Sequence, residues 1–211
     1  MSGNQRDRVR QPQRKRGIAR FHHLLDATEA LLTKRPDSDI SLALLAQEAD
    51  VPLPSIYHFF PNKDAILVAL AMRHHEQLAE MAREPLDPPP DTWQDIVIRR
   101  QRAGVEFLNA HPSALRLFMG AGVSAEVRTL DLEGNAALAQ LRAREFRHWF
   151  DCRGIADLEA RLAVSIGVMD GVWAISWSQH RRLTEAYLEE STRASIAYLR
   201  CYLPEILPRL T

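Results

Sequence analysis

Hydrophobic positions recur at helical spacing along most of the chain. The first stripe lies within residues 17–34 and consists of Ile18, Phe21, Leu25, Thr28 and Leu32. Spacings of three and four residues place these side chains on one face, so this segment is predicted to be an amphipathic helix. We find no convincing run of alternating apolar and polar residues, which is the pattern of a half-buried strand. We therefore expect an all-α protein.

Residues that cap or end helices divide the N-terminal part. The segment Pro36-Asp37-Ser38-Asp39 ends the first helix. Ser41 suits the N-cap of a short helix over 41–49, because its hydroxyl can accept a hydrogen bond from a backbone N–H of the first turn. The apolar face of that helix is formed by Leu42, Leu45, Ala46 and Ala49.

Prolines frame a third helix, predicted over 54–60. The tight turn Asp50-Val51-Pro52 precedes it, and Pro54 fits its first turn, where a missing backbone N–H costs nothing. Pro61 then ends this helix. Asn62 can cap a long fourth helix that runs to about Arg83.

A proline-rich break over 85–90 separates these helices from the rest of the chain. Such a break is typical of a rigid turn or short linker. Beyond it the periodicity predicts helices over 91–109, 112–120, 124–151, 155–181 and 184–202. The stretch "LAVSIGVMDGVWAISW" is apolar on almost all sides, which indicates a helix buried on more than one face.

Composition narrows the class of protein. A chain of 211 residues with 46% hydrophobic and 26% charged residues is typical of a globular protein, not of a disordered or rod-like one. No apolar run approaches the ~20 residues needed to span a bilayer, and no apolar segment of a secretory signal follows the basic N-terminus. Cys152 and Cys201 suggest neither a disulfide scaffold nor a zinc site. We expect a cytoplasmic protein with no membrane partner, no metal and no cofactor.

The net charge of zero hides a basic N-terminus. Residues 1–20 contain seven arginines and lysines against Asp7 alone, so the remaining chain is acidic. A basic arm on an acidic body indicates a polyanionic partner such as nucleic acid, but a flexible solubilising tail would have the same composition.

The second and third helices form a predicted helix-turn-helix, a motif that binds DNA. Ala46 and Ala49 are small enough for the helices to cross closely, and apolar anchors follow the turn. Ser55, Tyr57 and His58 are left on the outer face of a helix short enough to enter a major groove, where they can contact base edges or phosphates.

The segment "SLALLAQEADVPLPSIYHFFPNKDAIL" resembles the N-terminal domain of the tetracycline-repressor-like (TetR) family of bacterial transcriptional regulators. The close resemblance covers about residues 18–70. The matching residues are Ser41, Leu45, Ala46, Ala49, Val51, Ile56, Tyr57, Phe60, Lys63, Asp64, Ile66 and Leu67. The sequence departs from the family at Asp50, where a turn glycine is usual, at Pro36, and at 52–54, where Leu53 either contacts a base or packs on the body.

The resemblance implies which residues contact DNA. The helix-turn-helix itself is not basic, so affinity must depend on the arm before the first helix and on helix N-termini such as that at Lys63. For Tyr57 the alternative is a partly buried core position. The expected DNA contacts are Arg14, Lys15, Arg16, Ser41, Leu53, Pro54, Ser55, Tyr57, His58 and Lys63.

Two histidine pairs, His22-His23 and His74-His75, resemble metal ligands only superficially. Adjacent helical side chains point about 100° apart, and no carboxylate or cysteine completes either site. We expect these histidines at the surface.

The resemblance also implies a C-terminal body with a ligand cavity and a dimer interface. Helices 155–181 and 184–202 are expected to pair with their copies in a homodimer. Asp170, within the apolar stretch, either holds a polar group of the ligand or pairs with an arginine across the dimer. The expected cavity residues, each of which could instead be ordinary core, are Phe107, Leu115, Phe118, Met119, Trp149, Met169, Asp170, Trp173 and Trp177.

The predicted organisation is an arm over 1–16, a DNA-binding domain over 17–63 with its motif at about 39–58, a connecting helix over 64–84, and a ligand-binding and dimerisation domain over 91–211. The predicted function is repression at a palindromic operator, with release by a small apolar or aromatic inducer. Two alternatives stay open: an architectural or division-linked DNA binder with no inducer, and a helical enzyme, for which the sequence has no HExxH, phosphate-loop or GxSxG motif.

Overall fold

The computed structural model describes residues 15–35, 40–120 and 123–210, and within these ranges the chain consists of helices, turns and one isolated bridge between Phe150 and Arg209. The helices are α1 (Lys15–Lys34), α2 (Leu42–Glu48), α3 (Leu53–Tyr57), α4 (Lys63–Arg83), α5 (Trp93–Ala110), α6 (Pro112–Met119), α7 (Ala125–Trp149), α8 (Leu158–His180) and α9 (Glu185–Leu199). Every bound lies within three residues of its prediction, and the all-α fold class is confirmed.

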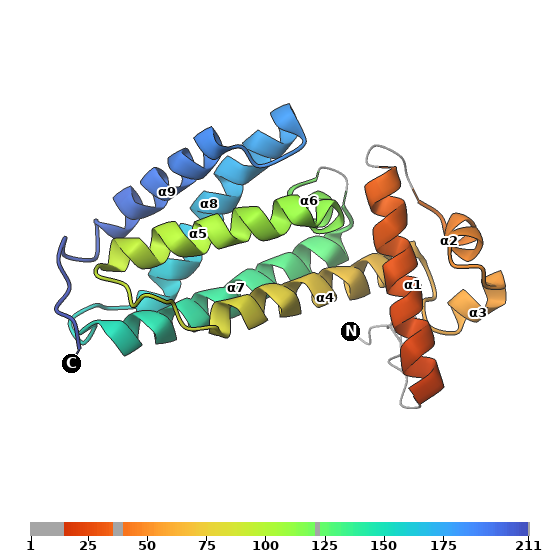
Figure 1. The fold of residues 1–211 in the computed structure, drawn as a ribbon, viewed down its shortest axis with the longest axis horizontal. Helices are drawn as coiled ribbons and strands as arrows, with labels where there is room; N and C mark the ends of the chain where they lie inside the picture. Colours follow the sequence, from red (N-terminus) through yellow and green to blue (C-terminus); the bar gives the residue numbers. More distant parts are fainter. Residues whose placement is uncertain (1–14, 36–39, 121–122, 211) are drawn as a thin grey trace, which may run out of the picture.

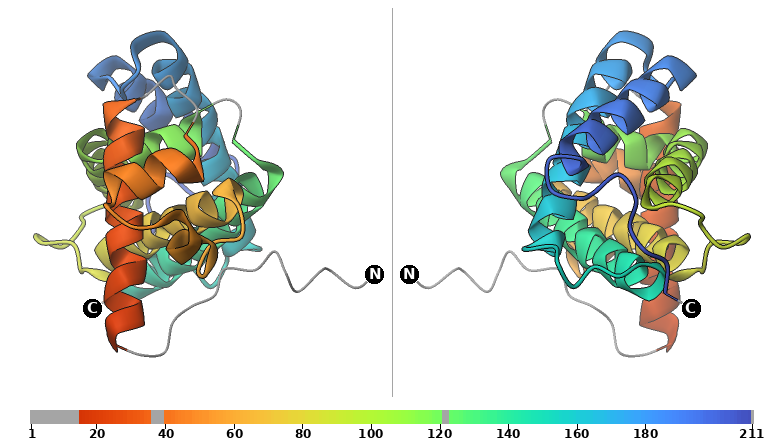
Figure 2. Two further views of the ribbon diagram at one scale, coloured as in Figure 1. Left: turned by 90° about the vertical axis from the view of Figure 1, so that its right-hand side faces the viewer. Right: turned by 90° about the vertical axis from the view of Figure 1, so that its left-hand side faces the viewer.

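The helices form a small N-terminal unit and a longer bundle. Helix α1 crosses the end of the bundle, and α2 and α3 lie on its outer side, away from α5 to α9 (Figure 1). Helix α4 runs from this unit into the bundle beside α7 (Figure 1). Viewed end-on, α1, α2 and α3 cover one end of the molecule (Figure 2).

The predicted caps and turn of the N-terminal unit are present. The Ser41 hydroxyl accepts a hydrogen bond from the Leu44 backbone N–H at 3.2 Å, and the Asn62 side-chain oxygen accepts one from Ala65 N–H at 2.8 Å. Asp50 has a φ of +49°, the left-handed geometry that glycine adopts most readily. Aspartate tolerates this geometry better than most residues, so the turn is kept.

Helix α3 ends earlier than predicted, at Tyr57 and not at Phe60. The backbone N–H groups of Phe59 and Phe60 both donate to the carbonyl of Ile56, which closes a turn. This turn buries both phenylalanine rings, and Phe21 of α1 packs against them. Burial of two aromatic rings therefore takes precedence over one further turn of helix.

Polar contacts join α1, α4 and α6 where the N-terminal unit meets the bundle. Arg73 donates to Asp26 at 2.5 Å and to Glu29 at 2.6 Å. The Ser113 hydroxyl donates to Glu29 at 3.2 Å and lies 3.1 Å from Nε2 of His74. These contacts satisfy polar groups that the junction would otherwise bury at a cost.

The prediction that all four paired histidines lie at the surface was wrong for His74 and His75. His74 is fully buried in the α1–α4–α6 junction, and burial lowers the pKa of its imidazole. His75 is largely buried between α4 and α7. His22 and His23 are exposed, as predicted. The error arose because α1, α6 and α7 cover the side of α4 that carries the second pair.

A close contact fixes how α4 packs on α7. The imidazole of His75 lies against the backbone of α7 at Gly134, and its Nε2 lies 3.2 Å from Oδ1 of Asp131. A Cβ atom at Gly134 would come within 2.3 Å of the His75 ring. The His75 ring also packs on Phe118 of α6, with centroids 4.4 Å apart. Only glycine at position 134 leaves room for this arrangement.

We predict that Gly134→Ala destabilises the fold by about 1–3 kcal/mol, because the added methyl group displaces the His75 ring from its place against α7. Helix propensity alone would favour alanine at this position by about 0.5–1 kcal/mol. Urea unfolding followed by circular dichroism measures the difference. Increased stability of the variant would show that the contact with His75 does not constrain α4.

Candidate functional site

Helix α3 presents a short polar face to solvent. Ile56 is fully buried, whereas Tyr57 on the opposite side is 53% exposed and His58 is also exposed. The alternative of a partly buried core tyrosine is therefore wrong for Tyr57. Pro54 is exposed and Ser55 is half-buried. This five-residue helix and its C-cap His58 thus offer aromatic, imidazole and hydroxyl groups together at the end of the molecule.

Leu53 differs from the other predicted contacts of α3. Its side chain is half-buried and packs against the core of the N-terminal unit. Of the two interpretations left open by the sequence, packing on the body is therefore the one the structure supports. Leu53 therefore extends the apolar anchor of α3.

Helix N-termini lie on both sides of α3 along the chain. Ser41 caps α2 and is exposed, and Lys63 begins α4 directly after its Asn62 cap. Free backbone N–H groups at a helix start attract anions, and a lysine there adds a charge for the same anion. Lys15 and Arg16 are exposed in the first turn of α1, not in an arm before it, and Arg14 lies outside the described residues.

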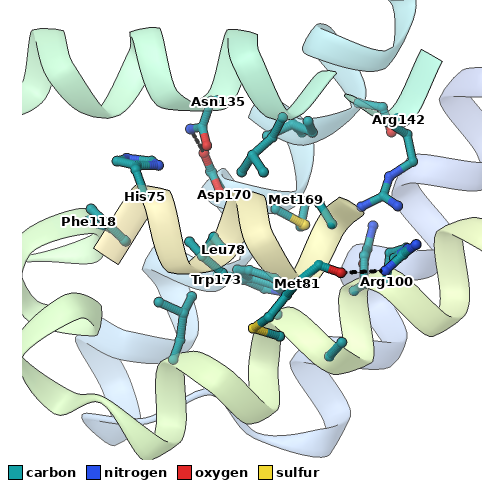
Figure 3. A pocket seen from close by; sticks show the side chains of 18 of the residues that line it. His75, Leu78, Met81, Arg100, Phe118, Asn135, Arg142, Met169, Asp170 and Trp173 are labelled. Atoms are coloured by element: carbon teal, nitrogen blue, oxygen red, sulfur yellow. Dashed lines mark hydrogen bonds between the residues drawn. The ribbon is translucent and has the colours of Figure 1, made fainter. Parts of the chain in front are cut away.

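A cavity lies inside the bundle between α4, α5, α7 and α8, with α6 at one end (Figure 3). The space open to the centres of water-sized molecules is about 120 Å³, far more than the 10–15 Å³ that one water needs. Its apolar wall is formed by Leu78, Met81, Val97, Leu108, Phe118, Met119, Leu138, Leu162, Ile166, Met169 and Trp173.

Acidic and amide side chains form one end of the cavity (Figure 3). Asn135 donates a hydrogen bond to Asp170 at 2.6 Å. Asp131 accepts one from Arg128 at 2.6 Å and contacts His75. Burial, reinforced by the neighbouring Asp131 charge, raises the pKa of the Asp170 carboxyl to about 7. This acid is therefore partly protonated at neutral pH.

Arginines form the other end. Arg100 of α5 and Arg142 of α7 both line the cavity and both pair with Glu145, each at 2.5 Å. Arg100 also donates to the backbone carbonyls of Met81 at 2.9 Å and Glu84 at 2.6 Å, which ties the end of α4 to α5. The apolar side chains of the cavity lie between these two polar ends (Figure 3).

The structure places five of the nine predicted cavity residues in this wall: Phe118, Met119, Met169, Asp170 and Trp173. Phe107, Leu115 and Trp177 are instead buried in the core that joins the bundle to the N-terminal unit. Trp149 packs in a second core around Trp93. The prediction that these four line the cavity was therefore wrong, because neighbouring helices fill the space around them.

Sequence reasoning included Asp170 but missed the other residues of the two polar ends. His75, Arg100, Asn135 and Arg142 come from three helices that are far apart in sequence, and no local motif connects them. The only available signal was a charged or amide residue on the inner face of a predicted helix. Within the described ranges, no group of three potential metal-binding side chains occurs, and no helix is long and apolar enough to cross a membrane.

We predict that Asp170→Asn weakens the pH dependence of stability. The folded protein holds the Asp170 proton up to pH about 7, whereas the unfolded chain loses it near 3.8, so raising the pH between these values destabilises the fold. From pH 5 to pH 8 the wild type should lose about 1–3 kcal/mol more than the variant. Unfolding free energies at several pH values measure this, and parallel curves would contradict it.

Comparison with known proteins adds to this geometry. Residues 24–70 match the family model for "Bacterial regulatory proteins, tetR family". The HTH-type transcriptional regulator EthR of Mycobacterium tuberculosis (strain ATCC 25618 / H37Rv) is 40% identical over 93 residues, which are 44% of this chain and 43% of EthR. The HTH-type transcriptional repressor NemR of Escherichia coli (strain K12) is 32% identical over 76 residues, which are 36% of this chain and 38% of NemR.

The aligned part spans less than half the length of these curated relatives. Over a larger share of the chain, a solved TetR transcriptional regulator from Rhodococcus sp. RHA1 has the same fold, with a TM-score of 0.65 at 17% identity over 88% of this chain and 98% of that one. The N-terminal match lies over α1 to α4, which carry the exposed face of α3. Residues 24–70 of this chain are thus similar to the domain described by the model for bacterial regulatory proteins of the tetR family.

Proposed function

We propose that this protein is a dimeric, sequence-specific transcriptional regulator that represses from a palindromic operator and is released by a small apolar or aromatic ligand. The observation that carries the DNA-binding part is the exposed face of α3, where Tyr57 and His58 project beside the buried Ile56. The helix N-terminus at Lys63 follows directly. The proposal includes a cytoplasmic location, because the DNA of a bacterial cell lies in the cytoplasm.

In the proposed complex α3 enters the major groove. Tyr57 packs its ring on a thymine methyl group or bonds a phosphate, and Ser55 and His58 donate to base edges or phosphates. Lys63 and the N-terminus of α4 bind one phosphate together. Between residues 40 and 63 the described charged side chains are Glu48, Asp50 and Lys63, so the exposed Lys15 and Arg16 of α1 contribute essential positive charge.

Helix α4 provides the proposed connection between ligand and DNA. Its first half packs Ile66 and Leu70 in the core of the N-terminal unit, and its second half places His75 and Met81 on the cavity. A ligand that favours a different position of α4 would change the spacing of the two α3 helices in a dimer. Binding of ligand and of operator would then oppose each other through a shift in population.

The cavity distinguishes between two of the alternatives. An architectural DNA binder needs no internal space, and a C-terminal body packed without cavities would have favoured that function. The cavity inside the bundle instead supports the ligand-responsive regulator. The family match and the relatives named as regulators give no support to the enzyme alternative.

An uncovered apolar strip on α8 supports the proposed homodimer. Val164 and Ile175 are each 48% exposed and lie on one side of the helix. Gly167 and Gly171 lie between them, and a Cβ atom at either would meet no other atom within 4 Å. Small residues between exposed apolar ones allow a second helix to approach closely, as a two-fold interface requires.

We predict that Tyr57→Ala and Lys63→Ala each weaken operator binding about tenfold or more. Loss of Tyr57 removes a base or phosphate contact, whereas loss of Lys63 should also reduce the slope of log affinity against log salt by about one. The operator is obtained by selecting genomic fragments with the purified protein, and fluorescence anisotropy then gives the affinities.

Tyr202→Ala is the matched control, because Tyr202 is also an exposed tyrosine, at 43%, but follows α9 and not α3. Its affinity for the operator should equal that of the wild type. Binding that shows no preferred sequence and is unchanged in the two α3–α4 variants would rule out the proposed recognition surface.

We predict that Ile175→Asp converts the dimer to a monomer, since it places a charge in the proposed apolar interface. Sedimentation equilibrium should show at least a tenfold rise in the dimer dissociation constant. Ile206→Asp, where Ile206 follows α9 and is 82% exposed, is the control and should leave the mass unchanged. A wild type that is monomeric at micromolar concentration would refute the dimer.

A further inference from the structure

The basic end of the cavity carries more positive than negative charge. The guanidinium groups of Arg100 and Arg142 share the single carboxylate of Glu145. All three side chains are largely buried, with exposed fractions of 10%, 18% and 9% respectively. Two positive charges and one negative charge leave this group with an excess of one positive charge.

The two arginines have different roles. Arg100 is committed to the fold, since its nitrogens donate to Glu145 and to the backbone carbonyls of Met81 and Glu84. Arg142 donates one hydrogen bond, from Nη1 to Glu145. A guanidinium has five N–H donors, so Arg142 keeps capacity for another acceptor. Its side chain extends from α7 toward Arg100 at this end of the cavity (Figure 3).

A buried cation that lacks a full counter-charge is unfavourable. Burial lowers the pKa of the Arg142 guanidinium to about 10, which still leaves the group charged at neutral pH. The excess charge is therefore not relieved by loss of a proton. An anion from outside the chain would relieve it and would also use the remaining donors of Arg142.

The rest of the cavity limits what kind of anion can bind. Between the two ends the wall is mostly apolar, with Leu78, Met169 and Trp173 (Figure 3), although Gln101 and Ser165 also line it. The opposite end holds Asp170 and Asp131, whose carboxylate already pairs with Arg128, so it offers no uncompensated cation to a second anionic group. A suitable ligand therefore has one anionic head and an uncharged apolar body.

We infer that the ligand class of this cavity is an apolar carboxylic acid, bound with its carboxylate at Arg142 and its body against Trp173 and Met169. The inference rests on the proposed ligand-responsive function. A planar carboxylate matches the fork of a guanidinium through two parallel hydrogen bonds. With the ligand carboxylate bound, two negative charges, from the ligand and Glu145, balance the two positive charges of Arg100 and Arg142.

Isothermal titration calorimetry on the full chain tests the inferred ligand class. Within each set of probes the apolar part is the same and only the head group differs. The first set is 4-phenylbutanoate, 4-phenylbutan-1-ol and 4-phenylbutan-1-amine, and the second is octanoate, octan-1-ol and octan-1-amine. In at least one set the carboxylate should bind about tenfold or more tightly than the alcohol, and the amine should bind weakest, because only the anion completes the charge pairing.

Three variants locate the head group. Arg142→Met should weaken carboxylate binding about tenfold or more and leave alcohol binding within about twofold. Arg142→Lys keeps the charge without the fork, so it should retain part of the preference. Arg144→Met removes an exposed arginine from the same helix and should change nothing. Circular dichroism verifies that the variants fold. If Arg142→Met does not fold, the loss of carboxylate preference is measured in Arg142→Lys instead.

Four outcomes would each overturn the inference. These are equal binding of acid and alcohol, strongest binding of the amine, no binding of either carboxylate, and an unchanged preference in folded Arg142 variants. Operator binding without any probe is measured on the same preparations. Intact operator binding with one of these outcomes removes only the carboxylate assignment. Loss of sequence-specific DNA binding in the wild type would instead remove the proposed function.

Discussion

The position of α4 is the constraint on which the rest of the structure depends. Its first half packs Ile66 and Leu70 in the core of the N-terminal unit, and its middle packs His75 against α7. Neither half can move far without exposing apolar surface or breaking the junction of Arg73, His74 and Ser113. The relative placement of α3 and the cavity is therefore set by how a single rigid helix packs.

Much of the fold could be predicted because local rules determine it. Ser41, Asn62 and Asp50 act through hydrogen bonds and backbone geometry within a few residues, and the structure confirms what their sequence positions indicated. Tyr57 was placed outward by the same logic, since its neighbour Ile56 had to be the anchor. Periodicity over long segments also located every described helix to within a turn.

The cavity could not be predicted to the same extent, for a physical reason. Periodicity identifies the inward face of a helix but not whether another helix fills the space it faces. Trp149 and Met169 are both large apolar residues in predicted helices. Trp149 nevertheless packs in the core around Trp93, whereas Met169 borders the cavity. His74 was wrongly predicted to lie at the surface for a related reason: the residues that bury its side chain, such as Ser113, are distant in the chain.

The two polar ends of the cavity also have a consequence for the energetics of binding. The arginine end carries an excess of positive charge and the other end carries carboxyl groups, across a largely apolar interior where screening by salt is weak. In such a field the two orientations of a dipolar guest differ in energy. A reversed guest would place its negative end beside Asp131 and Asp170, which makes that binding mode the less stable one.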